Sequence, residues 1–399
     1  MGHLQAFKEK LKKNRFLYKI SQPIYYFSKD FKLKIKQLVF SPFLLMPIKN
    51  NKIVFVSYKG DGFGDSGKRI IKYMAEVKAI DSFEVYWALS SEEDKKKLPN
   101  SITGIKYPSI SFYYHMSTAK FWIDNSRKYE YPIKRAKQKY IQTWHGGLAL
   151  KKIEKDAGDK LTNYYIRNAK KDSNMIDLFT SNSKFQTNLI KESFWYNGEI
   201  AEIGTPRVDY LLKVNDKEEV KQKLGIPLDK KVALYAPTFR NTYDQSNFIN
   251  DFEKLSENLT DYIFLVRYHP NDKKRIQIQS RKNVMDATNY PDMYELMKAA
   301  DILITDYSSS MFEFSFMKKP VFLFVKDYNE YLDERGLYFN IEKLPYSLVS
   351  NEKDLIESIY NFDLIQYQKE LCEFFLEIDL YEQGNASKSI YDYIMSQMK

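Results

Sequence analysis

The sequence has little cysteine and no long apolar run. Its 399 residues include a single cysteine, Cys372, which excludes a disulfide framework or a thiolate metal site and is typical of a reducing cytoplasm. The longest uncharged apolar run, residues 38–48, contains Pro42 and Pro47. It is far shorter than the roughly 20 residues that span a bilayer, and no cleavage-like small-residue site follows it. We therefore expect neither a membrane-spanning anchor nor a signal peptide.

Most of the net charge of +10 lies in one segment. Residues 1–50 contain eleven Lys/Arg and two acidic residues, whereas the rest of the chain is nearly balanced. Lysines alternate there with large apolar side chains, as in FKLKIKQLVF (31–40). Such a segment suits the headgroup region of an anionic membrane, where each basic residue contributes about 1 kcal/mol. We predict peripheral membrane attachment through residues 1–50. A solvated basic helix packed on the protein is the alternative, and nucleic acid is not expected because no reading module is present.

The remaining sequence indicates two α/β domains. The chain exceeds the roughly 250–300 residues at which a single core stops growing, and short apolar runs alternate with helical patterns from residue 51 onward. The predicted strands lie at 52–58, 83–89, 119–125, 139–145, 176–182 and 199–204 in the first half, and at 232–239, 262–270, 300–308 and 319–325 in the second.

A Gly, a Pro and a charge cluster at 224–231 are typical of a linker. The predicted fold is therefore two doubly wound Rossmann-type domains, at 51–223 and 224–370, with a cleft between them. Residues 371–399 are predicted to form a helix that crosses back. Ligands of such sheets bind beyond the carboxyl ends of the strands.

One predicted strand ends on an imidazole. The stretch YIQTWHGGL (140–148) places His145 at a strand end, followed by Gly146 and Gly147, in a chain with only four histidines. Two residues without a Cβ would let an acceptor and a phosphate approach the backbone closely. The sequence thus places a polar, titratable side chain at the edge of the sheet where ligands bind.

The glycine-rich stretch 57–70 has the Gly-x-Gly-x-x-Gly spacing of a dinucleotide-binding turn. The acidic partner of that motif would have to be Asp81 or Glu84, which lie before or at the start of the next strand rather than at its end. NAD binding is therefore disfavoured. We favour a flexible turn in which Gly64 and Asp65 contact an acceptor.

The stretch ITDYSSSMFEF (304–314) predicts an anion site. A strand ends near Asp306, Ser308 and Ser309 follow, and a helical pattern then begins. Helix N-termini carry free N–H groups that suit a phosphate. Glu313 lies three residues after a serine and also fits a capping box, so both interpretations stay open.

Basic side chains lie at two neighbouring strand ends. Arg267 and His269 are two residues apart, which places them on one face of a strand, and Arg240 follows the strand at 232–239. Clustered Arg and His facing a cleft are difficult to explain by packing, and they suit a diphosphate.

Together, QTWHGG, APTFR, RYHP and TDYSSSMFEFSFMKKPVFLF resemble the CDP-glycerol glycerophosphotransferases of bacterial teichoic acid synthesis, over residues 51–370. The resemblance implies a GT-B-like pair of Rossmann domains at the cytoplasmic face of the membrane. It implies transfer of glycerol phosphate or ribitol phosphate from CDP-glycerol or CDP-ribitol to a hydroxyl of a lipid-linked glycan or teichoic acid, with release of CMP.

The same resemblance assigns roles to individual residues. It makes His145 the general base, His269 a second catalytic residue and Glu313 a ligand of the donor ribose. It places the remaining donor-site residues around the phosphates: Arg240, Arg267, Asp306, Ser308 and Ser309.

Some points depart from the family or stay open. The family's Trp-His-Gly turn continues with Thr-Pro, whereas here Leu148 and Ala149 follow the glycines. No carboxylate pair has metal-ligand spacing, so no cofactor is expected, although Mg²⁺ on the donor diphosphate stays open. The alternative function is a GT-B glycosyltransferase that uses a nucleotide sugar for cell-surface polysaccharide synthesis. A catalytically inactive binding protein is a second alternative.

Overall fold

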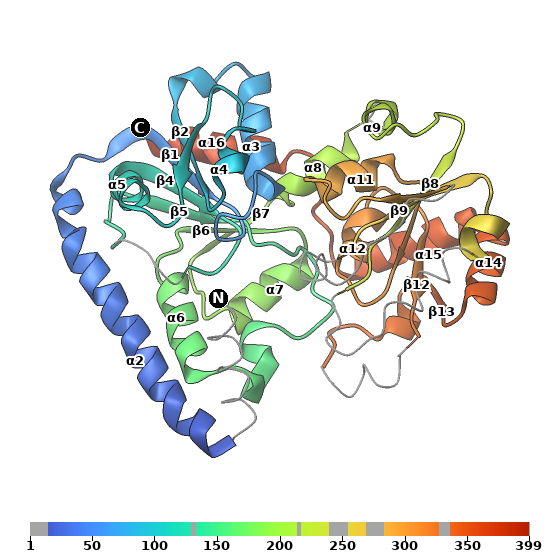
Figure 1. Cartoon of the computed structure of the whole chain (residues 1–399), viewed down its shortest axis with the longest axis horizontal. Coiled ribbons are helices and arrows are strands. Elements are labelled where there is room, and N and C mark those ends of the chain that lie inside the picture. Colours follow the sequence, from blue (N-terminus) through green and yellow to red (C-terminus); the bar gives the residue numbers. More distant parts are fainter. Residues whose placement is uncertain are drawn as a thin grey trace.

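The computed structural model has two parallel α/β lobes, one built on each of two sheets (Figure 1). It describes residues 15–128, 133–213, 217–238, 254–268, 283–326 and 336–398, with side chains from residue 22 onward. The predicted site residues Arg240 and His269 lie outside these ranges.

The first sheet has seven parallel strands in the order β3-β2-β1-β4-β5-β6-β7. The strands are β1 (Lys49–Val56), β2 (Glu84–Leu89), β3 (Thr103–Lys106), β4 (Ala119–Asp124), β5 (Lys139–Gln142), β6 (Leu178–Ser181) and β7 (Glu199–Glu202). Helices cover both faces of this sheet, because the central strands carry apolar side chains on both faces. The neighbouring residues Ile53 and Val54 of β1, for example, belong to two different buried apolar clusters.

The helices of this lobe are α3 (Asp65–Glu76), η2 (Ile80–Ser82), α4 (Glu92–Lys95), α5 (Ile110–Thr118), η3 (Glu154–Lys160), α6 (Asn163–Ser173) and α7 (Lys184–Ser193).

The second sheet has six parallel strands in the order β10-β9-β8-β11-β12-β13. They are β8 (Lys231–Tyr235), β9 (Tyr262–Val266), β10 (Val284–Asp286), β11 (Ile302–Thr305), β12 (Val321–Phe324) and β13 (Ser347–Val349). The helices of the second half are α9 (Lys217–Lys223), α11 (Met293–Ala299), α12 (Ser310–Ser315), η5 (Ile341–Lys343), α14 (Glu352–Tyr360) and α15 (Leu364–Glu377).

Both sheets have the doubly wound strand order, which confirms the predicted fold class. The order reverses between β1 and β4 in the first sheet and between β8 and β11 in the second. Ligands of such sheets bind beyond the carboxyl ends of the strands at this point. The sequence did not predict three strands, β3, β10 and β13. Each is three or four residues long and lies at an edge of its sheet, away from the point where the strand order reverses.

Two helices join the lobes. Helix α8 (Pro206–Leu212) packs on α3 of the first lobe and on α11 of the second. After α15, whose Phe374 lies in the core of the second lobe, the chain returns to the first lobe as α16 (Ala386–Met398). There Ile390 and Ile394 pack with Ile53 of β1. The region around α8 is therefore the natural place for contacts between the lobes.

The basic N-terminal segment forms helix α2 (Arg15–Val39) and the short helix η1 (Ser41–Leu45). Figure 1 shows α2 along one edge of the first lobe, beside α6. The Tyr26 ring stacks on that of Tyr164 at 4.4 Å, and Asp30 forms an ion pair with Arg167. Across the described ranges, the structure contains no helix with the length and apolar character needed to cross a membrane.

Candidate active site

His145 lies three residues beyond the end of β5, at the carboxyl edge of the first sheet. Its Nδ1 is 2.8 Å from the carbonyl oxygen of Asn125, which follows the neighbouring strand β4. Because a carbonyl oxygen only accepts hydrogen bonds, Nδ1 carries the proton in the neutral ring. Nε2 then keeps a lone pair that is free to accept a proton.

The surroundings of His145 favour the neutral ring. The side chain is exposed to solvent, yet surrounding protein desolvates it enough to lower its pKa below the ordinary 6.5, and the Asn125 carbonyl opposes this shift only in part. Tyr58, whose ring centroid lies 6.1 Å from that of His145, is likewise exposed, and desolvation raises its pKa. Both side chains lie at the carboxyl edge of the first sheet and are accessible to solvent, and at neutral pH the imidazole of His145 is unprotonated.

The backbone before His145 is strained and firmly held. Trp144 has φ of 51°, in the left-handed region that costs a bulky L-residue roughly 1–2 kcal/mol. Its N–H donates to Oε1 of Gln142 at 2.9 Å, and its carbonyl accepts from Nη1 of Arg207 at 2.8 Å. The Trp144 ring is buried against Phe194, with ring centroids 4.8 Å apart. These contacts fix the turn that directs His145.

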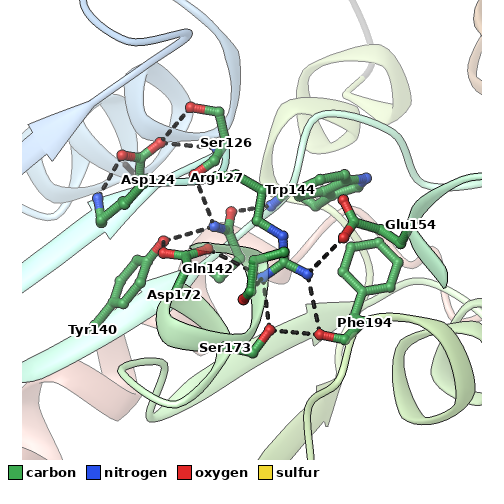
Figure 2. Close-up of polar contacts among 12 residues, drawn as sticks. Asp124, Ser126, Arg127, Tyr140, Gln142, Trp144, Glu154, Asp172, Ser173 and Phe194 are labelled. Atoms are coloured by element: carbon green, nitrogen blue, oxygen red, sulfur yellow. Dashed lines mark hydrogen bonds and ion pairs between the residues drawn. The ribbon is translucent and has the colours of Figure 1, made fainter. Parts of the chain in front are cut away.

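Figure 2 shows a buried polar network behind Trp144. Arg127 is at its centre and donates to Glu154 at 3.0 Å and to Asp172 at 3.1 Å. It also donates to the carbonyl of Phe194 at 3.1 Å. All three charged side chains are almost fully buried. A buried cation with two carboxylate partners makes this part of the lobe rigid.

The network continues to the backbone of Trp144. Asp172 accepts from the hydroxyl of Tyr140 at 3.3 Å, and that hydroxyl accepts from Nε2 of Gln142 at 2.7 Å. Gln142 in turn holds the N–H of Trp144. Burial raises the pKa of Asp172 to about 6, against the opposing effect of Arg127. The position of His145 therefore depends in part on the buried charges of this network.

The two glycines after His145 have different surroundings. A Cβ on Gly147 would lie 2.3 Å from Nδ2 of Asn182, so Gly147 is required by packing within the protein. A Cβ on Gly146 would meet nothing within 4 Å. Close approach of a ligand therefore stays a prediction for Gly146, and the structure gives Gly147 a separate reason to be glycine.

The glycine-rich turn leads into α3, with Gly64 before its first residue, Asp65. The buried carboxylate of Asp65 accepts from the hydroxyl of Tyr58 at 2.7 Å and from the N–H of Ser66 at 2.6 Å. An acid that occupies the helix N-terminus leaves a pyrophosphate poor space there, which also argues against a dinucleotide. The acceptor roles of Gly64 and Asp65 stay predictions. The exposed side chains of this turn include that of Tyr58.

On the second lobe, Asp306 holds a neighbouring loop. Its two carboxylate oxygens accept from the backbone N–H of Thr238 at 2.8 Å and from the Thr238 hydroxyl at 2.9 Å. Thr238 follows β8 and is the last described residue before the segment that contains Arg240. Asp306 therefore fixes the course of the chain towards Arg240, and direct contact with the donor stays a prediction.

Arg267 follows β9 in the second lobe and is half-buried. Its Nη1 donates to the carbonyls of Tyr290, at 2.5 Å, and Ala287, at 3.4 Å. Burial lowers its pKa, and the negative charge of Asp292 opposes this shift only in part. Contact of Arg267 with the donor phosphates stays a prediction.

The serine turn differs from the predicted capping box. Ser309 precedes α12, but its side chain makes no capping hydrogen bond. The Ser308 Oγ accepts from the N–H of Ser310 at 3.3 Å and from its hydroxyl at 2.8 Å. Glu313 does not return to the start of α12, so the capping-box interpretation was wrong. The hydroxyl of Ser309 is not used for capping.

Glu313 instead faces the other lobe. Its Oε1 accepts from Nε and Nη2 of Arg207 at 3.0 and 2.6 Å, and its Oε2 accepts from the Tyr294 hydroxyl at 2.5 Å. Contact with a ribose stays a prediction for this carboxylate, which already has three donors. A second cross-lobe cluster joins α3 to α11, where Asp292 pairs with Lys68 at 2.5 Å and with Arg69 at 2.8 Å.

Within the ranges that the structure describes, no group of three or more His, Cys, Asp or Glu side chains has an arrangement that could hold a metal ion.

Tyr58, Arg127 and Arg207 were not predicted from the sequence. The first two could have been found, because Tyr58 ends the predicted strand 52–58 and Arg127 lies two residues beyond the predicted strand 119–125, at the edge where site residues gather. Arg207 gave no such signal, since it lies in the short helix that follows the last strand of the first sheet. Its partners are distant in the sequence, and only the fold brings them together.

Comparison with known proteins identifies relatives of this chain in sequence and in fold. The family model of CDP-glycerol:poly(glycerophosphate) glycerophosphotransferases matches residues 38–396. The teichoic acid poly(glycerol phosphate) polymerase of Bacillus spizizenii is 31% identical over 382 residues, which cover 91% of this chain and 96% of that protein. The teichoic acid glycerol-phosphate transferase of Staphylococcus aureus is 32% identical over 380 residues, which cover 89% and 96%.

A solved structure of the wall teichoic acid polymerase TagF matches with a TM-score of 0.82 and 30% identity. The match covers 94% of this chain and 98% of that chain. A variant of the same polymerase soaked with CDPG matches equally well, with a TM-score of 0.82 and 31% identity.

Proposed function

Because the chain belongs to the CDP-glycerol:poly(glycerophosphate) glycerophosphotransferase family, we propose that it transfers glycerol phosphate or ribitol phosphate from a CDP-alditol to a hydroxyl group of a lipid-linked glycan or teichoic acid. CMP is the second product. The state of His145 carries the proposal: its Nδ1 is held by the Asn125 carbonyl, its pKa is lowered, and the ring is open to solvent.

The reaction needs a base that is unprotonated at neutral pH. His145 accepts the proton of the acceptor hydroxyl at Nε2 while the acceptor oxygen forms a bond to the phosphorus that carries the alditol. The bond from that phosphorus to the oxygen of CMP breaks, and CMP leaves with the bonding electron pair. An imidazole with this protonation state is well matched to the task, and general bases contribute about 10²–10⁴-fold.

The second lobe supplies groups for the phosphates of the donor. Arg267 is a cation directly beyond the end of β9, and the hydroxyls of Ser308 and Ser309 lie beyond the end of β11. Preorganised donors and cations of this kind stabilise the charge that develops on a leaving phosphate. The predicted contributions of Arg240 and His269 concern residues outside the described ranges.

Replacing Ser309 with alanine tests the phosphate site. Because the Ser309 side chain does not cap α12, the substitution should leave the free energy of unfolding within about 0.5 kcal/mol. The loss of a hydrogen bond to a charged phosphate, worth about 1.5 kcal/mol, should raise the KM for the CDP-alditol roughly tenfold. Steady-state kinetics with varied donor measure this. Unchanged kinetics in the Ser308→Ala, Ser309→Ala double variant would show that the serines do not bind the donor.

The donor is identified by which nucleotide is released. The purified protein is incubated with CDP-glycerol or CDP-ribitol and a lipid-linked acceptor, and CMP is measured by chromatography. We expect CMP to appear together with an acceptor that has gained one alditol phosphate. Release of UDP from a UDP-sugar without any CMP from either CDP-alditol would instead identify a nucleotide-sugar glycosyltransferase.

We also propose that α2 attaches the enzyme to the cytoplasmic face of an anionic membrane. Five large apolar side chains recur along α2 at helical spacing and are all exposed: Ile24, Phe27, Phe31, Ile35 and Leu38. Lysines at 29, 32, 34 and 36 accompany this stripe. An apolar stripe with basic side chains beside it suits the headgroup region of anionic lipid.

Replacing Phe27 and Phe31 with serine should weaken binding to vesicles that contain phosphatidylglycerol by at least tenfold. Burial of even part of each ring contributes more than about 1 kcal/mol, and the vesicle-bound fraction is measured by sedimentation. The matched control replaces Ile365 and Leu376 with serine, because both are exposed apolar residues of α15 in the other lobe. Equal binding by the stripe variant and the wild type would contradict the proposal.

A further inference from the structure

Arg207 is the one side chain that contacts the backbone of the His145 turn and carboxylates of both lobes in the described structure. We propose that Arg207 is a positioning residue that fixes the carbonyl of Trp144, and therefore the ring of His145, only while Glu313 of the second lobe is seated against it. The inference rests on the proposed transferase function and adds a coupling between the donor lobe and the base.

Different nitrogens of the Arg207 guanidinium group contact different partners. Nε and Nη2 donate to Oε1 of Glu313 at 3.0 and 2.6 Å, which leaves Nη1 directed to the carbonyl of Trp144 at 2.8 Å. The same Nη1 lies 3.6 Å from Oδ1 of Asp65. The side chain of Arg207 is fully buried, so water does not replace any of these partners.

The geometry makes the position of Nη1 depend on Glu313. A guanidinium group is planar and rigid, so a bond of two of its nitrogens to one carboxylate fixes where the third nitrogen points. If Glu313 moves away with its lobe, Asp65 is the remaining carboxylate near Nη1. Nη1 then turns from the Trp144 carbonyl towards Asp65.

The Trp144 carbonyl matters because Trp144 is strained. Its φ of 51° places it in a region that bulky residues leave when they are not held. Its N–H is tied by Gln142 and its carbonyl by Arg207. Release of the carbonyl removes one of the two ties that hold the backbone directly before His145.

A simpler interpretation is that Arg207 only clamps the two lobes together. Arg69 provides the comparison, because it is also buried, also lies in a helix at the lobe junction, and also pairs with a carboxylate of the second lobe, Asp292, at 2.8 Å. No contact of Arg69 reaches the His145 turn in the described structure. The two arginines therefore separate clamping from positioning.

The first test compares Arg207→Lys with Arg69→Lys in CMP release. Lysine keeps the charge but has one point-like donor group, so it cannot serve both Glu313 and the Trp144 carbonyl in the same way. We expect Arg207→Lys to lower kcat by about 10²-fold, the effect of a small displacement of a reacting group. The KM for the donor should change less than threefold, and Arg69→Lys should keep kcat within threefold. Equal losses in both variants, or a normal kcat in Arg207→Lys, would overturn the proposal.

The pH profile tests whether the cation of Arg207 lies close to His145, as the positioning role requires. The charged and titratable groups around His145 are Asp65 of α3, Glu154 of η3, Arg207 of α8 and the hydroxyl of Tyr58. The cation of Arg207 lowers the pKa of His145. Arg207→Met should therefore shift the acidic limb of kcat/KM to higher pH, whereas Arg207→Lys should leave that limb in place. An unmoved limb in Arg207→Met contradicts a site beside His145.

Glu313→Gln is a milder variant in case Arg207→Met does not fold. Glutamine can still accept a hydrogen bond, but without the negative charge Arg207 is drawn towards Asp65. We expect kcat to fall about tenfold at an unchanged KM. An increase in the KM for the donor alone would instead indicate that Glu313 binds the ribose, and would contradict the coupling.

Amide hydrogen exchange measures the coupling without any activity. Residues 144–147 should exchange at least tenfold faster in Arg207→Lys than in the wild type, and at the wild-type rate in Arg69→Lys. If the protein transfers nothing from a CDP-alditol, the proposed function fails while this measurement still decides the role of Arg207. Equal exchange rates in all three proteins would refute the positioning role.

Discussion

Replacement of His145 with alanine lowers kcat for CMP release from CDP-glycerol by about 10²–10⁴-fold, the contribution of a well-placed general base. The acceptor hydroxyl then loses the proton acceptor that Nε2 of His145 provides. The KM for the donor should stay within a few-fold, because the groups that we propose to bind the donor lie on the other lobe. The His145 side chain is exposed to solvent, so its removal should cost little stability. Stopped reactions with saturating donor and acceptor measure kcat.

His115 provides the matched control for this substitution. It is the other histidine in the described part of the chain, and it lies in α5 with its ring 3.8 Å from that of Tyr86. Burial lowers its pKa to about 4, so it is also neutral at pH 7. We expect His115→Ala to keep kcat within a few-fold. Turnover by His145→Ala that equals the turnover of His115→Ala would remove His145 as the base.

Replacement of Arg127 with methionine lowers the free energy of unfolding of the first lobe by about 3–5 kcal/mol, as is typical when one partner of a buried ion pair is removed. Glu154 and Asp172 would then be buried without their cation. Urea unfolding followed by tryptophan fluorescence measures the change, because Trp144 lies in this network. The activity should fall as well, since the network supports the turn that directs His145.

The loss in the Arg127 variant should depend on pH. The pKa of Asp172 is raised to about 6 in the folded protein, compared with an ordinary value of 3.8. A carboxyl whose folded pKa is raised disfavours folding when it is charged, and this cost shrinks as the pH falls below the folded pKa and is gone below the ordinary value. Without Arg127 the cost grows, so the deficit should be larger at pH 8 than at pH 5.

An exposed ion pair is the control for Arg127. Lys223 and Glu219 lie one turn apart on α9, and more than half of each side chain is exposed. Lys223→Met should change the free energy of unfolding by less than about 0.5 kcal/mol. A loss in Arg127→Met as small as that in the control would show that the buried network contributes little to the stability of the lobe.

The sheets and the position of His145 could be predicted from the sequence because they depend on local pattern. Runs such as YIFLV (262–266) and VFLF (321–324) are apolar on both faces, as central parallel strands require. His145 lies three residues beyond the end of the shorter strand β5. The strands that were not predicted, β3, β10 and β13, are only three or four residues long. They contain too few apolar residues to show the alternation or the apolar run that marks a strand in a sequence.

The roles of the charged residues could be predicted less well. Asp306 and Glu313 were assigned to the donor site from the family resemblance, and the structure pairs them with Thr238 and Arg207. A sequence pattern marks the end of a strand but does not reveal a partner that lies 68 or 106 residues away. The same reason hid Arg207, which has no meaning for the site until the two lobes are placed together.

The pH dependence of single-turnover CMP release tests the account most directly. At saturating CDP-glycerol, the rate of the wild-type protein should be constant from neutral pH upward and should fall below a single pKa lower than 6.5, because His145 must be unprotonated and its pKa is lowered. That limb should be absent from the residual activity of His145→Ala. A limb with a pKa above 6.5, or the same limb in both proteins, would contradict a neutral imidazole at position 145 as the base.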